Sequence, residues 1–274
     1  MAATLIVSHH EPSSSFFNMT QAGADNPLFS HAESPSPHPA RAQSLAPAAS
    51  TRQRDLTEFL VAYLLIALAL WTPLPWQRWL SLVALAWVIF ATARSFEGWQ
   101  AMGFRVTRFW RSIWVVAATL ILALAAALVA AQLQTLHPPP APIQFAQRYW
   151  AYTIWAFLQE FLLLNFFLPR LLRLIRRPIV ALFATAALFA LTHLPNPILA
   201  PLTLLWGCAA CLVFLRYRNI YVPAIGHAIL GICVAVTIPG PIDHNMRVGL
   251  GYLTYGHHHR HAPTGTRSTI PYPR

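Results

Sequence analysis

The sequence is poor in charged residues, which make up 10% of its 274 residues; lysine is absent, and only eight residues are Asp or Glu. Because soluble globular domains carry about 25% charged residues, this composition excludes that class. The hydrophobic content of 56% indicates an integral membrane protein instead. The net charge of +11 does not indicate a nucleic-acid partner, because the arginines lie at the ends of apolar runs rather than on one face.

Cysteine is also scarce. The three cysteines, Cys208, Cys211 and Cys233, all fall inside apolar segments, which excludes a disulfide framework. Two small residues separate the first two cysteines, so a helix-packing face is favoured there over a metal or redox site.

Both ends of the sequence lack apolar runs long enough to pack. Residues 1–54 are rich in Ser, Pro, Ala and His and are predicted to form a disordered N-terminal segment. The pattern of a secretory signal, a basic start followed by an apolar core, does not occur in this segment. Residues 241–274 are predicted to form a C-terminal tail that is mostly disordered. We therefore expect one transmembrane helical domain, formed by residues 55–240.

Seven apolar runs in this domain predict an all-α fold, a polytopic membrane bundle of about seven helices. A helix that crosses a bilayer needs about 20 apolar residues. The first run is short and begins at Phe59, or at Leu56 with Glu58 at the membrane interface. The expected helices cover residues 59–71, 79–93, 113–133, 149–168, 179–192, 197–215 and 220–238.

Arginine is distributed unevenly over the loops between these runs. With a cytoplasmic N-terminus, 13 arginines lie on the cytoplasmic side, and only Arg78 and Arg148 lie in outside loops before the C-terminal tail. Because cytoplasmic loops are enriched in basic residues, this bias predicts an N-terminus inside and a C-terminus outside. The expected location is a bacterial inner membrane.

Three ionisable residues lie in or next to apolar runs. Glu160 is the only acidic residue between Glu97 and Asp243, and His193 and His227 end or interrupt two later runs. Ionisable groups inside a membrane are costly and rare, and they usually serve a function. These three residues are therefore the candidate site.

One carboxylate and two imidazoles allow several kinds of site. The carboxylate of Glu160 can accept a proton from water while His193 and His227 orient that water and donate to an oxyanion. Alternatively, the three side chains can ligate Zn²⁺ with water in the fourth position, although no HExxH helix is present. A third possibility is a cluster of hydrogen-bonded polar side chains that only stabilises the packing of the helices.

The order of three motifs carries a family resemblance. The segment that begins Gln159-Glu160 and ends in Pro169-Arg170 resembles the EExxFRGxLxPRL helix of the CPBP (Abi) family of intramembrane proteases, which includes the CAAX prenyl protease 2, Rce1-like enzymes. Residues 189–193 resemble the second family motif, FxxxH, and residues 227–231 resemble the third, HxxxN or HxxxD. The resemblance covers roughly residues 148–238.

This resemblance implies an all-helical membrane endopeptidase. In the family, the leading Glu of the pair activates water, the two histidines assist, and the Asn or Asp helps to hold the oxyanion. The sequence departs from this pattern at Gln159, Leu164 and Gly231. Because Gln cannot act as a base, the resemblance leaves the base role to Glu160.

The resemblance also suggests supporting residues. Gln159 can orient a water molecule through its amide. Asn165 stands where the family has Gly and can supply a polar contact, and Phe189 and Gly231 belong to the second and third motifs.

We therefore expect an endopeptidase that cleaves membrane-associated peptides or proteins, with membrane lipids as its other partners. The alternative is a catalytically inactive relative that serves as a membrane binding or scaffold protein. A transporter that uses Glu160 for protons is less favoured, because no inverted repeat of apolar runs is evident.

Overall fold

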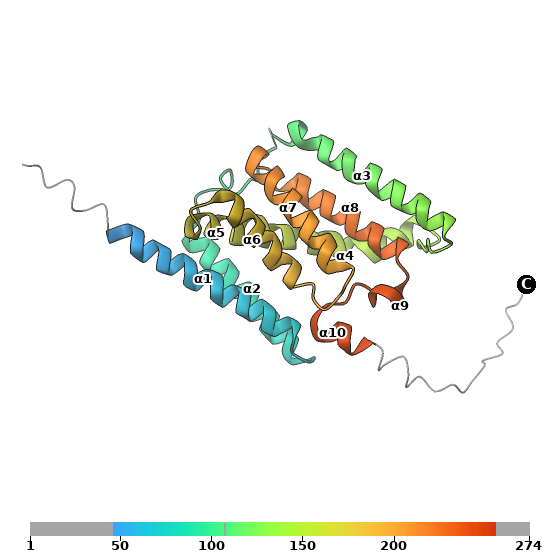
Figure 1. Ribbon diagram of the computed structural model, residues 1–274, viewed down its shortest axis with the longest axis horizontal. Coiled ribbons are helices and arrows are strands. Elements are labelled where there is room, and N and C mark those ends of the chain that lie inside the picture. The colour runs from blue at the N-terminus through green and yellow to red at the C-terminus, as the bar shows by residue number, and fades with distance from the viewer. Residues whose placement is uncertain (1–45, 107, 256–274) are drawn as a thin grey trace, which may run out of the picture. The chain divides into compact units, whose positions relative to one another are not determined.

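The computed structural model describes residues 46–106 and 108–255. Every regular element in these ranges is a helix, which confirms the all-α prediction (Figure 1). The elements are α1 (Ala46–Leu70), α2 (Trp76–Arg94), α3 (Phe109–Gln132), α4 (Pro142–Phe161), the π-helical segment η2 (Leu162–Phe167), α5 (Leu168–Leu174), α6 (Pro178–Leu191), α7 (Leu199–Tyr217), α8 (Tyr221–Thr237), α9 (Gly240–Asp243) and α10 (Gly249–Leu253).

Each of the seven predicted apolar runs forms a helix. By length and composition, α2, α3, α7 and the continuous α4–η2–α5 segment are long and apolar enough to cross a membrane. The apolar helices α6 and α8 are shorter, with 14 and 17 residues. The fourth helix begins at Pro142 rather than at Tyr149, because proline is well suited to the first turn of a helix.

The predictions for the two ends need correction where the structure describes them. Residues 46–54, assigned to the disordered N-terminal segment, form the first turns of α1. In the predicted tail, α9 and α10 are folded onto the bundle, and the backbone N–H of Gly249 donates to the carbonyl oxygen of Leu194 at 2.8 Å. The remaining parts of both predictions, residues 1–45 and 256–274, lie outside the described residues.

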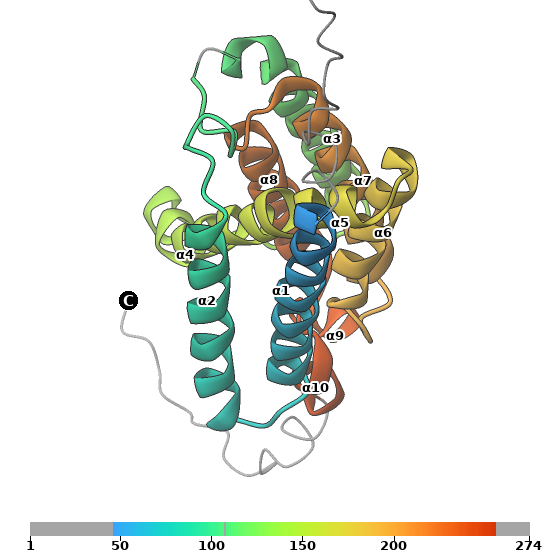
Figure 2. The same cartoon turned by 90° about the vertical axis from the view of Figure 1, so that its left-hand side faces the viewer.

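The helices pack in pairs around one bundle. The most extensive contacts join α3 with α8, α6 with α7, α1 with α2, and α4 with α8. Figure 2 shows α1 and α2 side by side, with α4 running crosswise to both. Helix α4 therefore connects the α1–α2 pair, through α5, to the helices that carry the two candidate histidines.

Two buried ion pairs fix α1 to α5. The guanidinium of Arg170 donates to the carboxylate of Glu58 at 2.7 Å, and both side chains are almost fully buried. One helical turn away, Arg173 binds Asp55 with two hydrogen bonds of 2.6 and 3.0 Å. Charges in an apolar interior are tolerated when they are paired in this way. These pairs explain how α1 holds two acidic residues in a membrane bundle.

A buried amide joins the end of α6 to the C-terminal helices. The side chain of Asn196 accepts hydrogen bonds from the backbone N–H groups of Ile198 and Leu199, both at 3.0 Å. Its amide donates to the carbonyl oxygen of Asp243 at 2.8 Å. Asn196 therefore both caps the start of α7 and holds α9 against the bundle.

Candidate active site

Helix α4 presents two neighbouring polar residues in different directions. Successive residues of an α-helix point about 100° apart. Gln159 accordingly lines a large cavity, whereas Glu160 is directed into the packing between α4, α7 and α8 and does not line it. The π-helical segment η2 begins two residues after Glu160, and such segments occur frequently at functional sites.

The carboxylate of Glu160 is completely buried. Its Oε1 atom accepts two hydrogen bonds, one from the indole Nε1–H of Trp206 at 2.6 Å and one from Nδ1 of His227 at 2.8 Å. Its Oε2 atom is buried without a hydrogen-bond partner in the described part of the chain. Glu160 and His227, which lie on different helices, are thus brought into direct contact as the sequence suggested.

The contact between Glu160 and His227 fixes the state of the imidazole. Because the carboxylate oxygen accepts, Nδ1 of His227 carries the proton, and Nε2 is left as the second ring nitrogen. His227 lines the cavity, and no hydrogen bond to its Nε2 is found among the described residues. This nitrogen is therefore available to a ligand.

Trp206 reaches Glu160 because α8 has a glycine beside it. A Cβ atom at Gly226 would lie 2.6 Å from the ring of Trp206, closer than real contacts allow. The absence of a side chain at this position lets the indole pass close to α8 and donate to Glu160.

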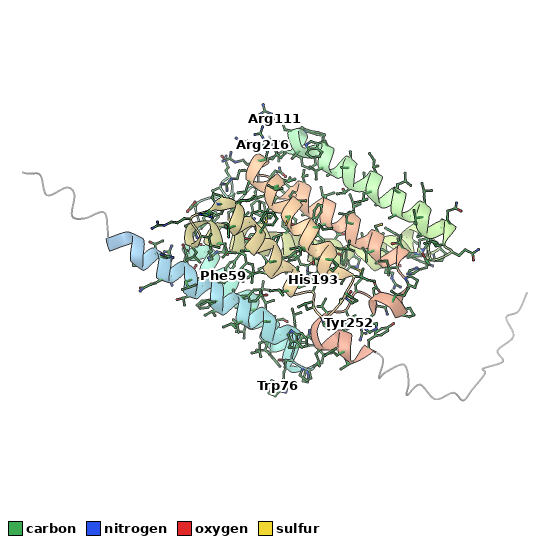
Figure 3. The ribbon with its side chains drawn as sticks, in the orientation of Figure 1. Phe59, Trp76, Arg111, His193, Arg216 and Tyr252 are labelled. Atoms are coloured by element: carbon green, nitrogen blue, oxygen red, sulfur yellow. The ribbon has the colours of Figure 1, made fainter. Side chains whose placement is uncertain are left out.

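His193 lies just beyond the end of α6, within the bundle, as Figure 3 shows. Its Nδ1 atom is 2.8 Å from the carbonyl oxygen of Phe189, one turn earlier, so Nδ1 carries the proton and Nε2 is free. The ring of Phe189 contacts both imidazoles, with centroid distances of 4.8 Å to His193 and 5.9 Å to His227. Phe189 thus packs against both histidines, and all three residues line the same cavity.

The cavity has a volume of about 1550 Å³, and its walls are mostly apolar. Residues from α1 to α4, η2, α6 to α8 and the segment after α8 contribute to it. The polar side chains that matter most for chemistry belong to His193, His227, Gln159 and Tyr152. A cavity of this size and character suits a long apolar ligand with a polar group near the imidazoles.

The predicted zinc ligands do not form a metal site. Among residues 46–106 and 108–255, no three His, Cys, Asp or Glu side chains are placed to hold a metal ion together. Oε1 of Glu160 is occupied by two donors, and one of them is Nδ1 of His227. These residues do not fit zinc, and no chemical step is assigned to it.

Of the four supporting residues predicted from the sequence, three line the cavity and one does not. Gln159, Phe189 and Gly231 line the cavity. Asn165 lies in η2 and does not line it, and its amide nitrogen is buried without a partner in the described residues. The polar contact expected from Asn165 is therefore not found at the cavity.

Sequence reasoning missed two residues of the site, Trp206 and Tyr152. Both are aromatic residues in apolar runs, which carry no sign of a polar role by themselves. The available signal was the pair of glycines that flank His227 on α8. A Cβ at Gly226 would collide with Trp206, and a Cβ at Gly231 would collide with Tyr152.

One comparison with known protein families gives a match. Residues 141–233 match the family model described as type II CAAX prenyl endopeptidase Rce1-like. This range runs from the start of α4 into α8 and contains Glu160, His193 and His227. No curated protein and no solved structure matches the chain.

Proposed function

We propose that the chain is an intramembrane endopeptidase that cleaves membrane-associated peptides or proteins, because its residues 141–233 match the model of the Rce1-like family of type II CAAX prenyl endopeptidases. The observation that carries the proposal is the pair formed by Glu160 and His227 beside a cavity that His193 also lines. The apolar helices support the integral membrane location.

The geometry favours His227, rather than Glu160, as the base. A buried carboxylate that accepts from Nδ1–H holds an imidazole in one tautomer and stabilises its protonated form, as in carboxylate–histidine pairs of hydrolases. Glu160 is sealed away from the cavity, whereas His227 lines it. The base role that the resemblance left to Glu160 therefore passes to Nε2 of His227, with Glu160 as the positioning residue.

Hydrolysis then follows as a general base reaction. Nε2 of His227 takes a proton from water while the water oxygen attacks the carbonyl carbon of the scissile peptide bond. The C–N bond breaks in the second step, and the proton on His227 passes to the leaving nitrogen. His193, whose Nε2 is free, and Gln159 both line the same cavity, and in this proposal they hold the water or the peptide.

The wall of the cavity supports a membrane-bound substrate. It is mostly apolar, so it favours an apolar peptide segment or one that carries a lipid. Arg111 and Arg216 lie at the same end of the bundle, as Figure 3 shows, which supports the orientation in which both are cytoplasmic. We propose a cytoplasmic N-terminus in a bacterial inner membrane on this basis.

The test is cleavage of a membrane-tethered peptide library by the purified protein in liposomes. Wild-type protein is expected to cleave, and His193→Ala, folded as judged by circular dichroism, is expected to lose most of the activity. The exposed His137, which does not line the cavity, provides the matched control in His137→Ala. A wild-type protein that cleaves no member of the library contradicts the proposal.

A binding or scaffold protein is the second candidate. It is favoured by the exclusion of Glu160 from the cavity and by the departures from the family pattern at Gln159, Leu164 and Gly231. Under this hypothesis the library peptides bind in the cavity and are recovered intact. Sustained cleavage by wild type that His193→Ala abolishes would exclude it.

A further inference from the structure

Tyr152 places a hydroxyl group on the backbone of α8. It lies seven residues before Gln159 on α4, about two helical turns, so the two side chains share a face of the helix and both line the cavity. A Cβ atom at Gly231 would lie only 1.7 Å from the hydroxyl oxygen of Tyr152. The hydroxyl thus occupies the space that any side chain at position 231 would fill.

This position is close to the proposed base. Gly231 follows His227 by four residues, one turn of α8, so both are on the same face of that helix. The Tyr152 hydroxyl therefore lies about one helical turn from His227 along α8, where a ligand bound to His227 can also contact it.

The hydroxyl of Tyr152 is an uncommitted donor. A tyrosine O–H in a protein interior usually finds a hydrogen-bond partner, yet in the described ranges this one has none. Apart from the amide of Gln159, the other donors on the wall near the imidazoles are already used. Trp206 donates to Glu160, Thr192 to the carbonyl oxygen of Phe189, and Thr203 to that of Leu199.

We propose that Tyr152 is a catalytic residue that donates its O–H hydrogen bond to the carbonyl oxygen of the scissile peptide as this oxygen becomes an oxyanion. The inference rests on the proposed endopeptidase function. When water attacks, the π electrons of the C=O bond move to oxygen, and the Tyr152 hydroxyl stabilises the resulting negative charge without giving up its proton. The electrons return when the C–N bond breaks and His227 protonates the leaving nitrogen.

This role explains why α8 has glycine at position 231. A side chain there would displace the hydroxyl from the wall, and a tyrosine from α4 reaches the same place across the helix interface. Stabilisation of the oxyanion by a preorganised donor is often the largest single contribution to hydrolysis. In this proposal the donor to the oxyanion is the Tyr152 hydroxyl of α4 and not a side chain of α8.

The test compares kcat and KM of Tyr152→Phe with those of wild type on a peptide that wild type cleaves. Because one oxyanion donor contributes about 100-fold to kcat, Tyr152→Phe is expected to lower kcat by about that factor and to leave KM nearly unchanged. The control is Tyr217→Phe, which removes a hydroxyl at the end of α7 that does not line the cavity. A kcat that stays at the wild-type value, or a loss that is confined to KM, overturns the inference and leaves the proposed function standing.

A second variant separates this role from simple packing. Gly231→Ala pushes the hydroxyl away and is expected to lower kcat in the wild-type background but to have little further effect on the kcat of Tyr152→Phe, because both changes remove the same interaction. An equal loss in both backgrounds contradicts the inference. Absence of cleavage by wild type would instead overturn the proposed function, and the inference with it.

Discussion

Nδ1 of His227 lies 2.8 Å from Oε1 of Glu160, and the same oxygen accepts from Trp206 at 2.6 Å. One carboxylate oxygen thus joins three helices, α4, α7 and α8, at the wall of the cavity. The arrangement fixes the tautomer of His227, which lines the cavity, and leaves its Nε2 free. The following predictions depend on this relationship and on the packing that maintains it.

Glu160→Gln is expected to lower kcat by about 1,000-fold or more, because an amide no longer stabilises the imidazolium and can present the wrong tautomer of His227. The cleavage rate of the liposome-reconstituted variant is the measurement. The matched variant is Gln159→Glu, which replaces an amide by a carboxylate one residue earlier, on the side of α4 that lines the cavity. Unchanged activity in Glu160→Gln contradicts the positioning role.

Gly226→Ala is expected to destabilise the protein by about 1–3 kcal/mol, because the new methyl group overlaps the ring of Trp206 and forces it to shift. Thermal unfolding followed by tryptophan fluorescence measures the effect, and cleavage is expected to fall as Trp206 leaves Glu160. The control is Gly251→Ala in α10, where the nearest atom to the added Cβ lies 4.0 Å away. Equal unfolding temperatures for the two variants contradict the account of Gly226.

Arg170→Ala is expected to cost about 3–5 kcal/mol of unfolding free energy, because it removes the hydrogen-bonded partner of the buried Glu58 carboxylate and leaves only Arg54 at 3.8 Å. The double variant Glu58→Leu/Arg170→Met removes both charges and is expected to be clearly more stable than Arg170→Ala. Denaturant unfolding in detergent micelles compares them. A double variant that is less stable than Arg170→Ala contradicts the assignment of this loss to an unpaired charge.

Asn196→Ala is expected to loosen α9 and α10, because the amide is their buried link to the loop before α7. Hydrogen exchange of the backbone amides of residues 240–253 should become faster, while exchange in α3 stays as in wild type. A uniform increase over the whole bundle would instead indicate global destabilisation.

Treatment with EDTA is expected to leave the cleavage rate unchanged. His227 uses Nδ1 for Glu160, and in the described residues no set of three side chains is arranged as metal ligands. A rate that falls with EDTA and recovers with added zinc contradicts this expectation.

The sequence was sufficient to predict the helical fold and to single out three candidate residues, because both depend on local signals. Apolar runs of membrane length predict helices, and Glu160, His193 and His227 are conspicuous by their rarity in such runs.

The roles of the neighbouring residues could not be predicted, because they depend on the rotation of each helix. Whether Gln159 or Glu160 faces the cavity is decided by how α4 packs on α7 and α8. Trp206 and Tyr152 acquire polar roles only through close approaches at two glycines of α8.

The ion pairs of α1 could not be predicted from the sequence either, because they too depend on helix packing. Asp55 and Glu58 are partnered by arginines more than 100 residues later in the chain, a relationship that no local pattern contains. The first helix therefore extends further toward the N-terminus than its short apolar run suggested.

The central claim is that His227, held by Glu160, activates water at this cavity. The most direct measurement is the kcat of His227→Ala on a tethered peptide that wild type cleaves, with His137→Ala as the control. The account predicts a loss of at least about 1,000-fold for His227→Ala and none for the control. Cleavage by His227→Ala at the wild-type rate, with the protein folded, would contradict it.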